Sequence, residues 1–433
     1  MSYIYKESSW SSITDNTKEW SSDKLFLLTE QNSKYISSLP KDATVITPLE
    51  LKSILKLDEL KVIGISGTNG KTTTSALLYS ILIDLGYISA LQGTRGLFID
   101  DKRVKSKSLT TPSILDTLLH MAEAKKRGAE YFVMEVSSHA IAQNRIEGLE
   151  FALKIHTNVT RDHLDYHGTI EEYRRIKSLF FQDNSLKLLN KDMIKTLQYN
   201  PNNSYSYGVE EPAAFKVLAY GLNSGINAVI RYKDEQEVFS SPMMGLFNLY
   251  NITAAISAAK LLTNRPLLEI CEVVEYFGGV SGRMEVISHN PTVIVDFAHT
   301  DDGMYRVLDS LKDKDLVVVF GAGGDRDRGK RPKMGAVAGR FAKKIYITSD
   351  NPRSEDPQAI ANDILIGLRG KDGVEVILDR SKAIDKAVSH LKRDEILLIL
   401  GKGDEDYQEI AGVKHPFDDR VEAKKALEKY FSI

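Results

Sequence analysis

Residues 67–74, GTNGKTTT, lie between the apolar run KVIGIS at 61–66 and the helical pattern SALLYSILIDLGY at 75–87. A strand, a glycine-containing turn and a helix in this order are typical of a phosphate-binding loop, because backbone N–H groups at the start of a helix can approach an anion. An ordinary strand-to-helix turn is the alternative, but the lysine and threonines after the second glycine argue against it. We therefore expect a nucleoside triphosphate to bind at Gly67, Thr68, Asn69, Gly70, Lys71, Thr72 and Thr73.

The pattern of apolar runs predicts three α/β domains in this chain of 433 residues. A polar, serine-rich segment at 1–60 has only short strand-like pieces and indicates a small N-terminal α/β domain. From residue 61, apolar runs alternate with helical patterns, which favours a central P-loop ATPase domain with a parallel sheet, at 61–285. A second alternating series predicts a C-terminal Rossmann-like, doubly wound domain at 286–433.

Composition excludes several classes of function. Lys plus Arg number 57 and Asp plus Glu 59, and the charges are interspersed, so no basic stripe is available for nucleic acid. No apolar run approaches the roughly 20 residues that span a bilayer, and the first residues lack the basic and apolar regions of a signal peptide. The single cysteine cannot form an internal disulfide. We expect a cytoplasmic protein without membrane insertion.

Two polar clusters follow the loop along the chain. The apolar run YFVMEV places Glu135 at the carboxyl end of a strand, where a carboxylate can hold Mg²⁺ beside a nucleotide. The second cluster, HTNVTRDHLDYHG at 156–168, includes His163 and precedes Lys177 in YRRIK. It lacks the companion ligands of a structural zinc site, and its residue types alone do not determine a chemistry.

Several segments resemble the Mur ligases in content and order. They are GTNGKTTT, MEVSSHAIAQNR, TNVTRDHLDYHG, FNLYN, GRMEV, DFAHT, GGDRDRGKRP, SDNPR and GKGDEDYQ. The resemblance covers about residues 61–420, is weak in the leading domain, and is strongest to members that add the third residue of the peptidoglycan stem peptide. It implies that ATP phosphorylates a substrate carboxylate and that an amine then attacks the acyl phosphate to form an amide.

The resemblance also implies roles at the reacting end of ATP. Lys71, with two Mg²⁺ ions, would offset charge on the transferred phosphoryl group. Thr72 and Glu135 would bind the first ion, and His163 and Lys177 the second, with Lys177 modified to a carbamate (N6-carboxylysine). Without the resemblance, Lys177 is simply a helix lysine. The other ATP contacts would come from Asn251, Arg283, Asp296 and His299.

Two further substrates follow from the resemblance. The first is UDP-MurNAc-L-Ala-D-Glu, for which the matching positions are Thr110, Thr111, Ser137, Gln143 and Arg145, with Asn16 or Thr17 from the leading domain. The second is meso-diaminopimelate, for which the matching positions are Arg326, Asp350, Asn351, Pro352, Arg353, Gly401 and Glu405. An arginine after Asp-Asn-Pro suits the carboxylate that distinguishes diaminopimelate from lysine.

The chain departs from the family pattern at three positions, and three rival functions share parts of its pattern. The chain has Leu109, Asp301 and Asp404 where the family usually has Asn, Pro and His, and none of these changes removes a charged catalytic group. Folylpolyglutamate synthase and the ligase for the D-Ala-D-Ala dipeptide are the nearest rivals, but DNPR and GKGDEDYQ argue against both. A P-loop switch would need neither a second-metal lysine nor an amino-acid pocket. The protein is expected to act as a monomer.

Overall fold

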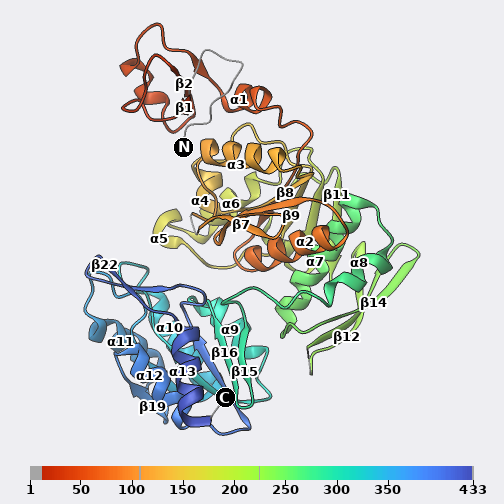
Figure 1. The fold of residues 1–433 in the computed structure, drawn as a ribbon. Helices are drawn as coiled ribbons and strands as arrows, with labels where there is room; N and C mark the ends of the chain where they lie inside the picture. The colour runs from red at the N-terminus through yellow and green to blue at the C-terminus, as the bar shows by residue number, and fades with distance from the viewer. Residues whose placement is uncertain (1–11, 107–108, 224, 432–433) are drawn as a thin grey trace.

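The fold is described from a computed structural model, which covers residues 12–106, 109–223 and 225–431 (Figure 1). The first residues, from which the lack of a signal peptide was predicted, lie outside this range. In Figure 1 the chain runs from a small leading unit through a large central unit to a C-terminal unit. Within the described residues, no helix has the length and apolar character needed to cross a membrane.

The leading segment forms a three-stranded parallel sheet and one short helix. These elements are β1 (Ser12–Thr14), β2 (Lys24–Leu27), β3 (Val45–Ile46) and α1 (Pro48–Ile54). Helix α1 begins where Thr47 and Glu50 form a capping box. Leu25 and Leu51 belong to the same buried apolar cluster as Phe132 of the central sheet, so the segment packs onto the central unit.

The central unit is built on an 11-stranded sheet whose middle strands are parallel. Strand β4 (Lys61–Ser66) pairs in parallel with β8 (Tyr131–Val136) on one side and β9 (Leu153–His156) on the other. The remaining strands are β5 (Ser89–Gly93), β6 (Gly96–Ile99), β7 (Lys102–Lys105), β10 (Lys187–Asn190), β11 (Ser204–Gly208), β12 (Phe215–Gly221), β13 (Ile226–Tyr232) and β14 (Glu235–Ser241). Both edges are antiparallel, at β5–β7 and at β12–β14.

Helices cover both faces of this sheet. One buried cluster joins the sheet to α2 (Lys71–Asp84), α7 (Leu246–Thr263) and α8 (Leu267–Val274). The other joins it to α3 (Ile114–Lys126) and α6 (Ile170–Leu179). Two short helices, α4 (Ser138–Ala142) and α5 (Leu164–His167), lie in the loops beyond β8 and β9. Because β4 is central and α2 is buried, the loop between them is held firmly in place.

The C-terminal unit is a six-stranded sheet in the order β15-β16-β20-β17-β18-β19, and only β15 is antiparallel. Its strands are β15 (Glu285–His289), β16 (Thr292–Asp296), β17 (Asp315–Phe320), β18 (Ala342–Ile347), β19 (Val374–Val376) and β20 (Glu395–Leu400). Helices α9 (Asp301–Asp309), α10 (Lys330–Phe341) and α11 (Pro357–Leu365) pack on one face, and α12 (Arg380–Ser389) and α13 (Asp419–Phe431) on the other. A hairpin of β21 (Tyr407–Ile410) and β22 (Val413–Pro416) follows β20. The predicted α/β class, with a doubly wound C-terminal sheet, is confirmed.

Candidate functional site

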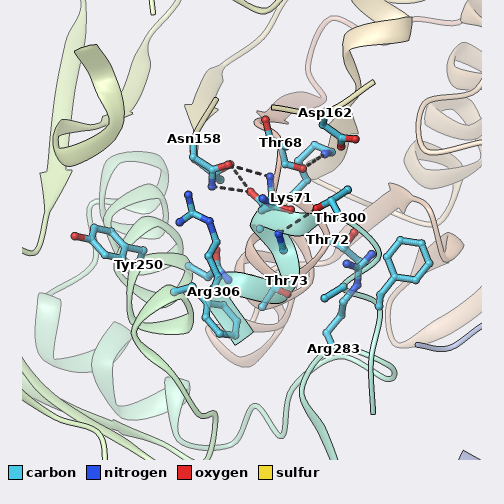
Figure 2. A pocket seen from close by; sticks show the side chains of 18 of the residues that line it. Thr68, Lys71, Thr72, Thr73, Asn158, Asp162, Tyr250, Arg283, Thr300 and Arg306 are labelled. Atoms are coloured by element: carbon cyan, nitrogen blue, oxygen red, sulfur yellow. Dashed lines mark hydrogen bonds between the residues drawn. The ribbon is translucent and has the colours of Figure 1, made fainter. Parts of the chain in front are cut away.

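The phosphate loop connects the end of β4 to the start of α2, as predicted. Figure 2 labels Thr68 of this loop and Lys71, Thr72 and Thr73 of the first helical turn. Gly70 has a φ of 85°, and a Cβ there would lie 2.4 Å from Oδ1 of Asn251, so a side chain at this position would be strained and crowded. The side chain of Asn158 fixes the loop, because its Oδ1 accepts from the Asn69 N–H at 3.0 Å and its Nδ2 donates to the Asn69 carbonyl at 3.1 Å. Lys71 Nζ donates to the carbonyl oxygens of Gly67 (2.8 Å) and Thr68 (2.9 Å). The lysine is therefore already placed at the loop.

Glu135 is the last residue but one of β8, lies beside this loop and is 1% exposed. Its Oε2 accepts from Thr72 Oγ1 at 2.8 Å, and its Oε1 accepts from the Thr94 backbone N–H at 2.9 Å. A carboxylate and a hydroxyl oxygen in contact are ligands that suit a hard cation such as Mg²⁺. The donor set thus fits the predicted first metal, while Thr94 carried no signal in the sequence. Among the residues that the structure describes, no group of three or more His, Cys, Asp or Glu side chains is arranged so that it could hold a metal ion by itself.

A cavity of about 310 Å³ opens above the loop. The four residues expected to contact the rest of ATP, Asn251, Arg283, Asp296 and His299, all line it. The carboxylate of Asp296 is hydrogen-bonded to the backbone, because it accepts from the N–H groups of Met284 and Ala298, both at 2.7 Å. Residues that sequence reasoning missed also line the cavity, among them Asn190, Met193, Tyr207, Phe247, Tyr250 and Arg306.

Lys177 and His163, the candidates for the second metal, differ in environment. Lys177 is 1% exposed, and its Nζ donates to the Gly67 carbonyl at 2.9 Å. Burial, and then the nearby Lys71, lower the pKa of Lys177 well below its usual value, which favours the neutral amine. His163 has a φ of 53° and lies beside Asp162, and burial lowers its pKa to about 4. A neutral imidazole is the form that binds metals.

A second cavity, of about 270 Å³, adjoins the first. Six of the seven residues predicted for diaminopimelate line it: Arg326, Asp350, Asn351, Arg353, Gly401 and Glu405. Pro352 does not line it, and its carbonyl instead lies against Gly324. Asp162, His163, Phe297, His299 and Thr300 line both cavities. The two spaces therefore share a wall at the predicted reaction centre.

The polar groups of the second cavity are only partly satisfied. Asp350 Oδ2 is buried and has no hydrogen-bond partner among the described residues. Glu405 accepts from Asn351 Nδ2 and from the buried Lys402 Nζ, both at 2.9 Å. Arg353 Nη1 donates to the Gly324 carbonyl at 2.7 Å, and its Nε lies 3.3 Å from Glu409. Since an unpaired buried carboxylate oxygen is unfavourable, Asp350 suits a cationic ligand such as an ammonium group.

The residues predicted for the UDP-linked substrate form a separate cluster near α4. Thr111 Oγ1 donates to the Glu135 carbonyl at 2.9 Å and accepts from the Ser137 N–H at 3.0 Å. Arg145 Nη1 donates to the Thr111 carbonyl at 3.0 Å, and Arg145 also bonds to the side chain of Gln143. The loop from β8 to α4 therefore joins this cluster to the candidate metal ligand.

The remaining predicted residues for this substrate are less concentrated. Thr110 lines the first cavity, and its Oγ1 is 3.0 Å from that of Thr94. Asn16 and Thr17 lie in the leading unit, where Asn16 bonds locally to Glu19. The contact that does reach the cluster comes from Gln31, whose Nε2 donates to the Gln143 carbonyl at 2.7 Å.

The fold and the two cavities define a P-loop nucleotide-binding protein whose C-terminal unit completes the site. Comparison with known sequences narrows this class: the profile of the Mur ligase middle domain matches residues 65–259, and that of the Mur ligase glutamate ligase domain matches residues 282–403. The chain belongs to the Mur ligase family.

Individual relatives agree with this assignment. The chain is 50% identical over 417 residues, 96% of each sequence, to the UDP-N-acetylmuramoyl-L-alanyl-D-glutamate--2,6-diaminopimelate ligase of Wolinella succinogenes. A solved structure under the same protein name is 31% identical, with a TM-score of 0.68 and coverage of 98% of this chain and 97% of that one. A Mycobacterium tuberculosis folylpolyglutamate synthase complexed with ADP is 17% identical over 82% of this chain and 91% of that one, with a TM-score of 0.66, and is similar in fold alone.

Proposed function

We propose that the chain is an ATP-dependent amide ligase that adds meso-2,6-diaminopimelate to UDP-N-acetylmuramoyl-L-alanyl-D-glutamate in peptidoglycan precursor synthesis. The observation that carries this proposal is the wall shared by the two cavities, at His163 and His299. A phosphoryl donor above Lys71 and an amine beside Asp350 would meet at this wall. The name of the Wolinella succinogenes relative supports the same pair of substrates.

The first chemical step would occur at the phosphate loop. The D-glutamate carboxylate attacks the γ-phosphorus of ATP, and ADP leaves. Lys71, now bonded to the Gly67 and Thr68 carbonyls, would turn to the transferring phosphoryl group and offset its charge. Bound Mg²⁺ supplies further charge neutralisation there, with Thr72 and Glu135 as its protein ligands.

The second step would occur at the shared wall. The diaminopimelate amine attacks the acyl carbon, the amide bond forms, and phosphate leaves with the electrons of the broken C–O bond, while the amine loses a proton. Asp350 would hold an ammonium group of the amino acid, and Arg326 and Arg353 its carboxylates. Lysine has no distal carboxylate, so its binding would leave an arginine unpaired in the cavity.

The second metal site is part of the proposal. Because burial lowers the pKa of Lys177 well below its usual value, the neutral amine is favoured, and CO₂ can add to it and convert it into an anionic oxygen ligand. Lys177 and His163 would then act together as ligands. Thr111, Ser137, Gln143 and Arg145 would bind the UDP-linked dipeptide, together with the leading segment.

We also propose that the chain divides into domains at 1–60, 61–285 and 286–433, that it is cytoplasmic, and that it acts as a monomer.

The proposal is tested by phosphate release from ATP with each substrate omitted in turn. Release should require both the UDP-linked dipeptide and meso-diaminopimelate, and lysine should replace the latter poorly. Equal release with ATP alone would instead favour a P-loop switch. Phosphate release that requires a folate substrate would favour a folylpolyglutamate synthase, a function that is supported here only by the shared fold.

A further inference from the structure

Asp302, in the first turn of α9, joins the C-terminal unit to the phosphate loop. Its Oδ2 accepts hydrogen bonds from Asn69 Nδ2 at 2.9 Å and from Thr160 Oγ1 at 2.8 Å. The same oxygen accepts from Arg306 Nε, one turn further along α9, at 3.0 Å. One carboxylate oxygen therefore connects two loops of the central unit to a helix of the C-terminal unit.

Arg306 is a cation at the wall of the nucleotide cavity. Its side chain is 24% exposed, and its terminal nitrogens have no hydrogen-bond partner within the described residues. Because Arg306 and Asn69 donate to the same oxygen, the guanidinium lies within two hydrogen bonds of the phosphate loop. In the view of Figure 2, Arg306 and Arg283 lie on either side of Lys71.

We propose that Arg306 binds the polyphosphate of the bound nucleotide, and that Asp302 is the positioning residue that holds Arg306 against the loop. A guanidinium with two unused terminal nitrogens suits phosphate, whose oxygens can accept two N–H groups in parallel. The nucleotide would then bond to both units, so its binding would favour the docked position of α9. This inference rests on the proposed nucleotide site and adds a phosphate contact from the C-terminal unit.

The phosphate contact is tested by the affinities of ADP and adenosine, each measured by displacement of a fluorescent ADP analogue. Arg306→Ala should weaken ADP binding about tenfold or more, as expected for loss of charge-assisted hydrogen bonds to phosphate, and leave adenosine binding within about twofold. Arg306→Lys keeps the charge without the planar fork and should lose less. Arg265→Ala is the matched control, because it removes an arginine from another i,i+4 ion pair, outside both cavities. Equal losses for ADP and adenosine, or no loss for ADP, would overturn the contact.

The positioning role is tested by hydrogen exchange of the α9 amides. In the unmodified protein, saturating ADP should slow the exchange of the α9 amides. In the Asp302→Asn variant, ADP should slow this exchange much less, and the exchange measured without ADP should be nearly the same as in the unmodified protein. A merely structural role would speed α9 exchange with and without ADP, and full protection by ADP in the variant would also contradict the proposal. These readouts require no ligation, so failure of the proposed ligase reaction is distinguished from failure of this inference.

Discussion

Lys71 and Lys177 donate to the same acceptor: the Gly67 carbonyl oxygen lies 2.8 Å from Lys71 Nζ and 2.9 Å from Lys177 Nζ. Two ammonium groups on one oxygen would repel each other, and both burial and Lys71 lower the pKa of Lys177, which favours its neutral form. The neutral amine is the form that reacts with CO₂. The shared carbonyl thus links the phosphate-binding lysine to the candidate carbamate.

Lys177→Met should abolish measurable ligation without lowering the free energy of unfolding at neutral pH. The substitution removes a desolvated amine, and Gly67 keeps its bond to Lys71. In CO₂-depleted buffer the unmodified enzyme should lose activity and regain it with bicarbonate, and the variant should show no response. Lys187→Met replaces another buried lysine, on β10 and outside both cavities, and should keep the bicarbonate response. A clearly destabilised Lys177→Met protein would indicate that the lysine is structural.

Glu135→Gln should remove the effect of Mg²⁺ on nucleotide binding. The amide keeps the size of the side chain but removes the charge that a hard cation requires. In EDTA, the ADP affinity of the variant should be nearly that of the unmodified protein. Addition of Mg²⁺ should increase the ADP affinity of the variant about tenfold less than that of the unmodified protein. Calorimetric titration with and without Mg²⁺ measures this difference. Glu130→Gln, at the exposed position just before β8, is the control, and an equal effect there would argue against a metal role.

Arg353→Ala should raise the KM for meso-diaminopimelate about 100-fold or more, because the variant cannot pair with the distal carboxylate. ADP affinity should stay within about twofold, since Arg353 lines only the second cavity. The preference for diaminopimelate over lysine should also narrow. Arg369→Ala, an exposed arginine, controls for loss of charge. Comparable losses in diaminopimelate use and in ADP affinity would mean that Arg353 supports the fold through its hydrogen bond to the Gly324 carbonyl.

The parts of the site that could be predicted are those encoded within one short segment. The phosphate loop needs only a strand, a glycine and a lysine in sequence, and Glu135 follows from its place at the end of an apolar run. The nucleotide wall could not be predicted in this way, because Asn190, Tyr250 and Arg306 come from three elements separated along the chain. Asn190 and Arg306 have no local signature, and Tyr250 stands out only as part of the segment FNLYN. The packing of α7 and α9 brings the three residues together.

Prediction of the fold was limited in the same way, to features that are encoded within one segment of the chain. Alternating apolar runs indicated parallel sheets, since buried strands and their crossover helices have distinct periods. They did not reveal that Leu25 and Leu51 of the leading segment pack into the central core, because such a contact depends on tertiary structure rather than on periodicity.

His156→Phe should stabilise the protein, and more so in acid. Both ring nitrogens of His156 are buried without a partner among the described residues, and the ring packs against Phe181. Burial lowers the pKa of His156 to about 3. Below its ordinary pKa of 6.5 the unfolded chain therefore takes up a proton that the folded protein excludes, and stability falls as pH falls from about 6.5 toward 3.

The His156→Phe variant has no imidazole to protonate, so it should not lose stability in acid through this group. The variant should gain about 1–3 kcal/mol at pH 7.5 from the deleted unpaired groups, and about 2 kcal/mol more at pH 5. Urea unfolding of the variant and the unmodified protein at pH 7.5 and pH 5 measures both gains in the free energy of unfolding. His415→Phe, on the exposed strand β22, is the control, since its ring is in water whether the chain is folded or not. A gain that does not grow between pH 7.5 and 5 would contradict the buried neutral state of His156, because the growth comes only from the proton that the folded protein excludes.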